Sequence, residues 1–306
     1  MNQAPHSHLA ISLESYYSAL RVQFAQQPIE FLLTDDFQVV FERMVDSLLS
    51  DEDLLLRYKN LKDGKRIDHL FGAPDAFRGN RIIYIGDSKY YKDPTQIATQ
   101  KFKQFTYARN IIQENIYITN EGSEDAYSRN YRDPMSEGYN ITPNFFVYAT
   151  VSSNDSRSGL LLEPDTRPPE FSWHFSNRLF DRDTLHVLYF RIDFLGLLQF
   201  YTSTLRRFTA SFEKLRGTSR SLIQSELQRY LACTYDFYQA ELSDPFIIEH
   251  FKALHGKIFT SPAIHPYYIL ALEKAYTDEN AAILSLFSER QIAYHTLQIT
   301  DAVAHM

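Results

Sequence analysis

Residues 81–91 read Arg-Ile-Ile-Tyr-Ile-Gly-Asp-Ser-Lys-Tyr-Tyr, an apolar run that ends in an acid and a base two positions apart. Side chains at positions i and i+2 of a β-strand point to the same side. Asp87 and Lys89 are therefore expected to leave the end of one strand together. Such a pair forms either a plain salt bridge or part of a site for a metal ion and a water molecule, and the flanking sequence has to decide between the two.

The composition is that of a folded protein. Of the 306 residues, 44% are hydrophobic and 23% are charged, so the chain can bury a sizeable core. The single cysteine, Cys233, excludes an intrachain disulfide and a Cys-based zinc site, and we expect its side chain to pack in an apolar segment. No apolar run reaches the ~20 residues of a membrane span, and no signal peptide is evident, so a cytoplasmic location is expected.

Positive charge is concentrated in one part of an acidic chain. The formal net charge is −7, but residues 57–109 contain twelve Lys and Arg against five Asp. This zone carries +7 and the remainder of the chain −14. A basic zone of this kind is typical of contact with a phosphate backbone, although it is also what a solvated basic face looks like.

The elements that flank residues 81–89 each carry one polar candidate. An apolar stripe at helical spacing predicts a helix over 37–49 with Glu42 at its edge, after a first amphipathic helix over 9–26. Residues 65–71 predict a strand with Asp68, joined to 81–89 by a turn-rich loop as a hairpin. His69 should face away from Asp68. Asp93-Pro94 predicts the start of a helix to about residue 113, which contains Gln104.

The remaining segments complete an α/β pattern with a helical end. Residues 144–151 and 184–192 predict strands, with polar loops over 120–143 and 152–170, and 51–63 looks like a connection. Helical patterns are expected at 205–216, 219–242, 245–255, 266–277 and 279–298. We therefore expect an N-terminal helix in 1–30, an α/β (α+β) domain with a mixed sheet in 31–203, and an appended helical region in 204–306.

Asp68, followed by Asp87-Ser88-Lys89 at the end of an apolar strand, resembles the D…(D/E)-x-K core of the PD-(D/E)xK nuclease superfamily. The order of helix with Glu42, strand, strand and helix with Gln104 matches as well. Within the superfamily, residues 67–71, 84–91 and 103–108 look like those of the McrC/LlaJI-type restriction enzymes. The resemblance covers roughly residues 35–200, and Ile67 and Asp87 stand where proline and glutamate are common.

The resemblance implies a restriction-endonuclease-like fold and a Mg²⁺-dependent endonuclease, with Mn²⁺ able to substitute. Asp68, Asp87 and Glu42 would hold the metal, Lys89 would position the attacking water, and Gln104 would support the site. Lys92, Lys101, Lys103 and Arg109 are candidate contacts to nucleic acid. The implied substrate is DNA, with RNA also open, in restriction or anti-phage defence. A homodimer and a separate NTPase or defence-complex subunit are partners by analogy, and no membrane is expected.

Two other interpretations stay open. The chain could be a non-catalytic nucleic-acid-binding module of the same fold, or an RNase or DNase effector that a signal activates. Taken singly, each candidate also has an ordinary structural role, because Asp87 and Lys89 make a salt bridge, Asp68 is a turn acid, and Glu42 and Gln104 are solvated helix residues. Only their convergence in space would favour the nuclease.

Overall fold

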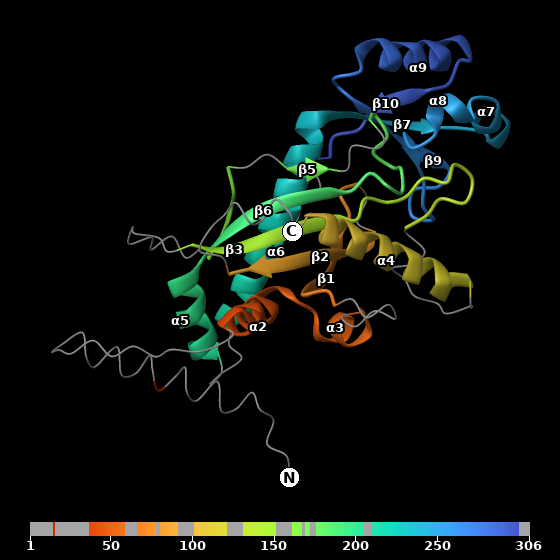
Figure 1. Ribbon diagram of the computed structural model, residues 1–306. Coiled ribbons are helices and arrows are strands. Elements are labelled where there is room, and N and C mark those ends of the chain that lie inside the picture. The colour runs from red at the N-terminus through yellow and green to blue at the C-terminus, as the bar shows by residue number, and fades with distance from the viewer. Residues whose placement is uncertain are drawn as a thin grey trace.

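The computed structural model describes Ser15 and residues 37–58, 66–77, 80–90, 101–120, 131–150, 161–166, 169–171, 176–204 and 210–299. The helix expected over residues 9–26, apart from Ser15, and the candidate Lys92 lie outside these ranges. Within them the chain has a mixed α/β fold with two sheets (Figure 1). No described helix is both long enough and apolar enough to span a membrane.

The first sheet has the strand order β1-β2-β3-β6, with β4 and β5 on the outer edge of β6. Its strands are β1 (His69–Pro74), β2 (Arg81–Lys89), β3 (Pro143–Thr150), β4 (Leu162–Pro164), β5 (Glu170–Phe171) and β6 (His186–Asp193). β1 and β2 form the expected antiparallel hairpin, whereas β2, β3 and β6 run parallel. The expected strand over 81–89 is confirmed, and β1 begins one residue after Asp68 rather than containing it.

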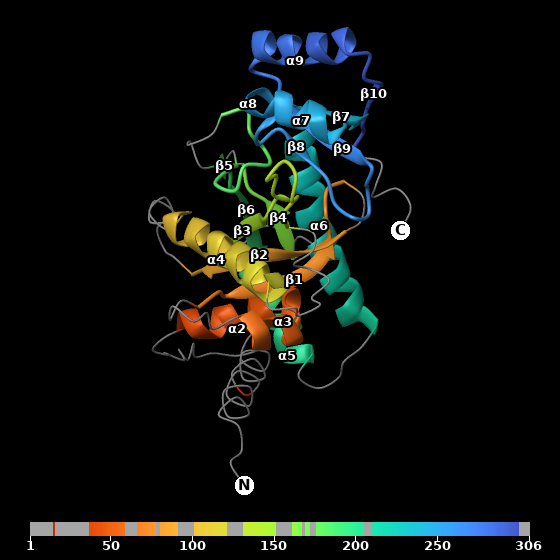
Figure 2. The same cartoon turned by 90° about the vertical axis from the view of Figure 1, so that its right-hand side faces the viewer.

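The central strands are apolar because both faces of the sheet are covered. Helix α4 (Lys101–Asn120) lies on one side of β2 and β3, and α6 (Ala210–Thr234) lies on the other, as two perpendicular views show (Figures 1 and 2). Helix α2 (Phe37–Leu49) contacts β1, β2, α6 and α5 (Phe194–Thr204). The expected connection over 51–63 is wrong in part, because Glu52–Tyr58 form the short helix α3 with Leu54 and Tyr58 buried.

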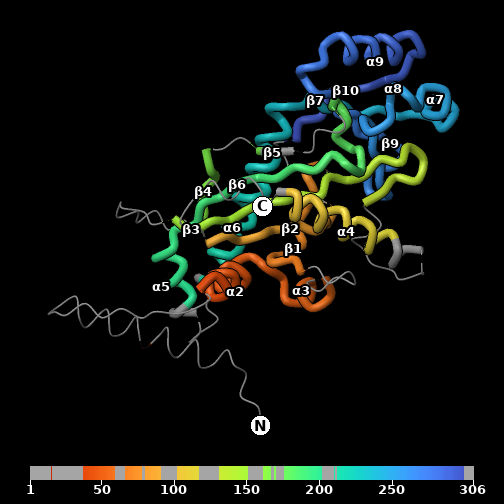
Figure 3. Tube along the Cα trace, in the orientation of Figure 1, coloured from red at the N-terminus to blue at the C-terminus, as the bar shows by residue number. Residues whose placement is uncertain are grey.

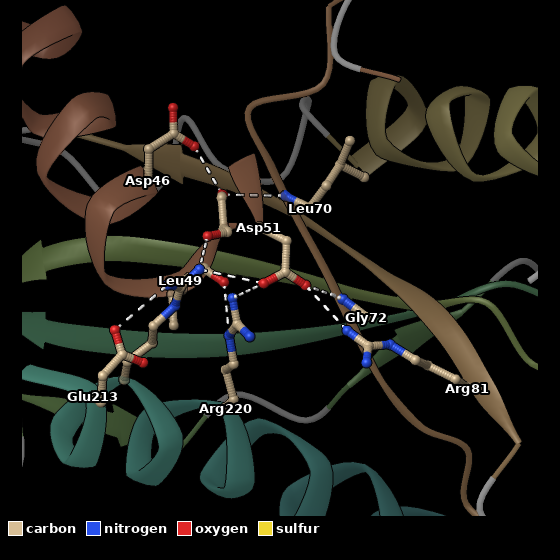
Figure 4. Close-up of polar contacts among 10 residues, drawn as sticks. Asp46, Leu49, Asp51, Leu70, Gly72, Arg81, Glu213 and Arg220 are labelled. Carbon is tan, nitrogen blue, oxygen red and sulfur yellow. Dashed lines mark hydrogen bonds and ion pairs between the residues drawn. The ribbon is translucent and has the colours of Figure 1, made fainter. Parts of the chain in front are cut away.

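Asp51 fastens the α2–α3 junction to the edge strand and to α6 (Figure 4). Its carboxylate accepts hydrogen bonds from the Gly72 backbone N–H at 2.9 Å and from Arg220 at 2.7 Å, and Arg216 and Arg81 lie within 4 Å. Burial alone would raise the pKa of Asp51, but the Gly72 N–H and the guanidinium groups of Arg220 and Arg216 outweigh it and lower this pKa. Three arginine side chains thus share one partly buried carboxylate as an ionic partner.

Replacing Asp51 with alanine is expected to lower the free energy of unfolding by about 2–3 kcal/mol, because the partly buried arginines lose their common partner. Urea denaturation at pH 7 measures this. Asp53→Ala is the matched control, since Asp53 lies exposed on the adjacent helix. Equal stability of the two variants would mean that the arginine cluster contributes nothing to the fold.

The helical end expected over residues 204–306 is wrong for much of its length (Figure 3). One helix, α6, replaces the two expected over 205–216 and 219–242, and it is followed by β7 (Tyr235–Glu241). The segment 266–277, expected to be helical, forms β9 (Tyr267–Glu273). With β8 (Ile258–Phe259) and β10 (Tyr294–Thr296), these strands form an antiparallel sheet in the order β10-β7-β9-β8. A short apolar run such as 267–272 does not distinguish a buried strand from a buried helix by its period.

Three helices accompany the second sheet: α7 (Asp244–Glu249), α8 (Phe251–Leu254) and α9 (Thr277–Glu289). The largest apolar core does not stop at residue 203, because Ile223 and Leu227 of α6 and Phe237 of β7 belong to the same cluster as the first sheet. Cys233 is exposed on α6, so the expectation that it packs is wrong. It lies on the outer side of a helix whose buried side carries Leu227 and Leu231.

Candidate active site

The acid–base pair of Asp87 and Lys89 is buried at the end of β2. Asp87 is 1% exposed and Lys89 is 4% exposed, and both belong to the same side of the strand. The Lys89 ammonium donates a hydrogen bond to Asp87 Oδ1 at 2.5 Å. Burying a single unpaired charge costs much free energy. Asp87 and Lys89 are therefore buried together as an ion pair.

Asp68, the residue that directly precedes β1, lies next to this pair. The register places His69 opposite Gly86, so Asp68, one residue earlier, lies beside Asp87 across the hairpin. Asp68 Oδ2 is 3.9 Å from the Lys89 ammonium, and the carboxyl groups of Asp68 and Asp87 share a hydrogen bond. Gly86 leaves the space that the Phe145 ring of β3 fills, since a Cβ at Gly86 would overlap that ring.

Glu42 extends the acids into a row. It lies half-buried on α2 and shares a hydrogen bond with Asp68. Burial, and then the carboxyl of Asp68, raise the pKa of Glu42 to about 7. Burial, and then the carboxyl of Asp87, raise the pKa of Asp68 to about 6. Carboxyl groups with a raised pKa are characteristic of functional sites, because a carboxyl group exposed to solvent keeps a pKa near its usual value.

Gln104 is fully buried, but its hydrogen bonds tie α4 to the sheet. Its Nε2 donates to the Ile85 carbonyl at 3.2 Å and lies 3.5 Å from Asn144 Oδ1. These contacts fix α4 against β2 at the point where β3 begins to pair with it. Gln104 is therefore placed two residues along the strand from Asp87, as a support for the strand end.

The four cations predicted to bind nucleic acid are placed differently from one another. Lys103 is exposed on α4 and interacts electrostatically with Asp87 and Asp68. Arg109, farther along α4, makes an ion pair with Asp183 at 2.6 Å. Lys101 begins α4, and its side chain is not among those described; Lys92 is outside the described ranges.

Three neighbours of the acids were not candidates in the sequence. His69, which the sequence places on the other side from Asp68, has its Nδ1 hydrogen-bonded to Asp46 at 2.8 Å and interacts electrostatically with Asp68 and Glu42. Arg66 is exposed and interacts with Glu42. Asp46 had a signal in the sequence, because it follows Glu42 by four residues and so shares its side of α2.

The Asp68 and Asp87 carboxylates fit a magnesium site with two protein ligands. Among the described residues, no three or more His, Cys, Asp or Glu side chains are grouped so that they could hold a metal ion. Mg²⁺ does not require such a cage, because it keeps several waters and binds one or two carboxylates. Asp87 Oδ2 is buried and receives no hydrogen bond in the described part of the chain, so one ligand oxygen of the Asp68–Asp87 pair has a lone pair to offer.

Comparison with known proteins gives no relative for this chain: no family model, no curated protein and no solved structure matches it significantly. The interpretation of the site therefore depends on its geometry. Buried Asp68, Asp87 and Lys89, with Glu42 beside them, offer oxygen ligands and a cation in one place, an arrangement suited to hydrolysis of an anionic ester.

Proposed function

We propose that this chain is a Mg²⁺-dependent endonuclease of the restriction-endonuclease-like fold, acting on DNA in a restriction or anti-phage defence setting. The observation that carries the proposal is the buried contact of Asp68, Asp87 and Lys89, together with the raised pKa of the Asp68 carboxyl. A module that only binds nucleic acid gains nothing from a buried acid cluster, which repels phosphate. That cost favours catalysis over the binding module.

The residues have separate tasks in this proposal. Asp68 and Asp87 would hold the metal, and Glu42, through its contact with Asp68, keeps that carboxyl in place. A bound Mg²⁺ would supply positive charge at the phosphate and lower the pKa of a water. The Lys89 ammonium, fixed by Asp87, orients the attacking water or stabilises the negative charge that develops on the phosphate. Gln104 holds the strand end in position through the Ile85 carbonyl.

The test combines cleavage with metal binding. Purified protein is incubated with plasmid DNA, single-stranded DNA and RNA in Mg²⁺, Mn²⁺ or EDTA, and Mn²⁺ binding is followed separately by electron paramagnetic resonance. We expect cleavage of DNA in Mg²⁺ or Mn²⁺, none in EDTA, and Mn²⁺ binding that Asp68→Ala weakens at least tenfold. Cleavage that persists in EDTA, or wild-type protein that binds no Mn²⁺ at millimolar concentrations, would contradict the proposal. Preferential cleavage of RNA would show that the substrate is RNA and not DNA.

A further inference from the structure

A chain of buried hydrogen bonds joins the beginning of β1 to α2. The Leu70 backbone N–H donates to Ser50 Oγ at 3.3 Å, and the Ser50 hydroxyl donates to Asp46 Oδ1 at 2.9 Å (Figure 4). The same Oδ1 is hydrogen-bonded to His69 Nδ1 at 2.8 Å. An ionised carboxylate only accepts hydrogen bonds, so we assign the proton of this bond to Nδ1. Because Asp46, Ser50 and His69 are all buried, water does not compete for these contacts.

The chain ends one residue away from the proposed metal ligand Asp68. Asp68 lies in the bend that directly precedes β1, and the pairing of β1 with β2 begins one residue later, between His69 and Gly86. The sheet therefore fixes the main chain from His69 onward. Asp68 itself is held by the residue that follows it and by the hydrogen bonds of its carboxyl group with Asp87 and Glu42.

Two successive turns of α2 bind two adjacent residues of this segment. Glu42 and Asp46 are four positions apart and so lie on the same side of the helix. Glu42 shares a hydrogen bond with the Asp68 carboxyl, and Asp46 binds the ring of the next residue, His69. A shift of either residue relative to α2 would break one of these bonds. The Asp46–His69 contact therefore fixes the main chain from which the Asp68 side chain extends.

The stability of the fold does not by itself explain this polar pair. The neighbouring residues Val45, Leu49 and Leu70 belong to the main apolar core, where an apolar pair would desolvate no polar atom. His69 Nε2 is buried and has no hydrogen-bond partner within the described part of the chain, so its desolvation is not compensated. A buried polar network with one unmatched atom contributes little to stability. Its value lies in the geometry that it imposes.

We propose that Asp46 and His69 are positioning residues that together hold the Asp68 carboxylate in the geometry of a metal ligand. The proposal rests on the proposed nuclease function and adds to it two residues that act only through Asp68. Loss of a residue that orients a metal ligand typically lowers metal affinity by about 10–100-fold, because binding then includes the cost of ordering that ligand. The effect is expected in the affinity for the metal, and not in the cleavage rate once the site is saturated.

Mn²⁺ binding to the metal-free protein, followed by electron paramagnetic resonance, tests the pair in variants whose circular dichroism matches wild type. We expect His69→Leu and Asp46→Ala each to weaken Mn²⁺ binding about tenfold. The double variant should be no weaker than either single one, because both side chains act through one hydrogen bond. His69→Asn should bind as wild type does, because its amide N–H can replace Nδ1–H toward Asp46. In cleavage assays the weakened variants should need more Mg²⁺ for half-saturation and keep the wild-type rate at saturation.

Ser47→Ala is the matched control, because the Ser47 hydroxyl donates to the Met44 carbonyl within α2. Its Mn²⁺ affinity should equal that of wild type. If His69→Leu and Asp46→Ala unfold at lower urea concentrations but bind Mn²⁺ as wild type does, the pair is structural and the proposal is wrong, while the nuclease stands. If neither variant folds, His69→Asn and His69→Gln decide. The pair is then contradicted unless the asparagine variant, whose N–H matches Nδ1, binds Mn²⁺ more tightly than the glutamine variant.

Two further outcomes separate this proposal from the nuclease. Wild-type protein that binds no Mn²⁺ at millimolar concentrations would contradict both. Wild-type protein that binds Mn²⁺ but cleaves neither DNA nor RNA, with His69→Leu and Asp46→Ala weakened as expected, would support the positioning pair and contradict the nuclease alone.

Discussion

Asp87→Asn is expected to reduce metal-dependent cleavage by about 10³-fold or more while the chain stays folded. An amide occupies the same volume as the carboxyl group, but it binds a cation far more weakly and cannot balance the Lys89 ammonium. Asp87 Oδ1 is the closest acceptor of that ammonium, and Oδ2 receives no hydrogen bond from the described residues. One substitution therefore removes a metal ligand and the partner that fixes Lys89.

Single-turnover cleavage of a labelled duplex in saturating Mg²⁺ measures the effect, and circular dichroism checks the fold. Ser88→Ala is the matched control, because Ser88 is equally buried and adjacent but points to the other side of β2. We expect this control to cleave within threefold of wild type. An Asp87→Asn protein that cleaves at the wild-type rate after two independent purifications would remove Asp87 from the chemistry.

The strand end at residues 81–89 could be predicted because local sequence and global fold agree there. A run of β-branched and aromatic residues favours a strand, and the abrupt change to Asp-Ser-Lys marks its end. The hairpin then brings Asp68 beside Asp87, and helical periodicity alone places Glu42 at the edge of the buried side of α2. These three steps need only spacing and pattern, and the contacts among Glu42, Asp68, Asp87 and Lys89 are among those that this spacing allows.

What could not be predicted depends on contacts between distant segments. The sequence does not predict that Asp51 pairs with arginines of α6, or that Arg109 forms an ion pair with Asp183. The second sheet was missed for a related reason, since β9 is central and buried on both faces, so it lacks the alternation that identifies a strand.

Asp68→Asn is expected to abolish the proposed cleavage activity and, in the metal-free protein at pH 8, to stabilise the fold by about 1–3 kcal/mol. Burial and the Asp87 carboxyl raise the pKa of Asp68 to about 6, so the folded state holds this proton more tightly than the unfolded chain does. The favourable contribution of the protonated group is complete below about pH 3.8 and is lost as the pH rises through about 6. At pH 8 an ionised Asp68 next to Asp87 is a cost, which an amide removes.

Thermal unfolding in EDTA at pH 4 and pH 8 tests this sign, with Asp53→Asn, on the exposed side of α3, as the control that should change neither value. We expect Asp68→Asn to raise the Tm by about 2–8 °C at pH 8 and to leave it nearly unchanged at pH 4. Added Mg²⁺ should then stabilise wild type but not the variant, because only the ionised pair gains a ligand. If the Asp68 carboxylate instead stabilised the fold, its replacement would lower the Tm at pH 8. Destabilisation of Asp68→Asn there would therefore show that Asp68 supports the fold and is not held at a cost for chemistry.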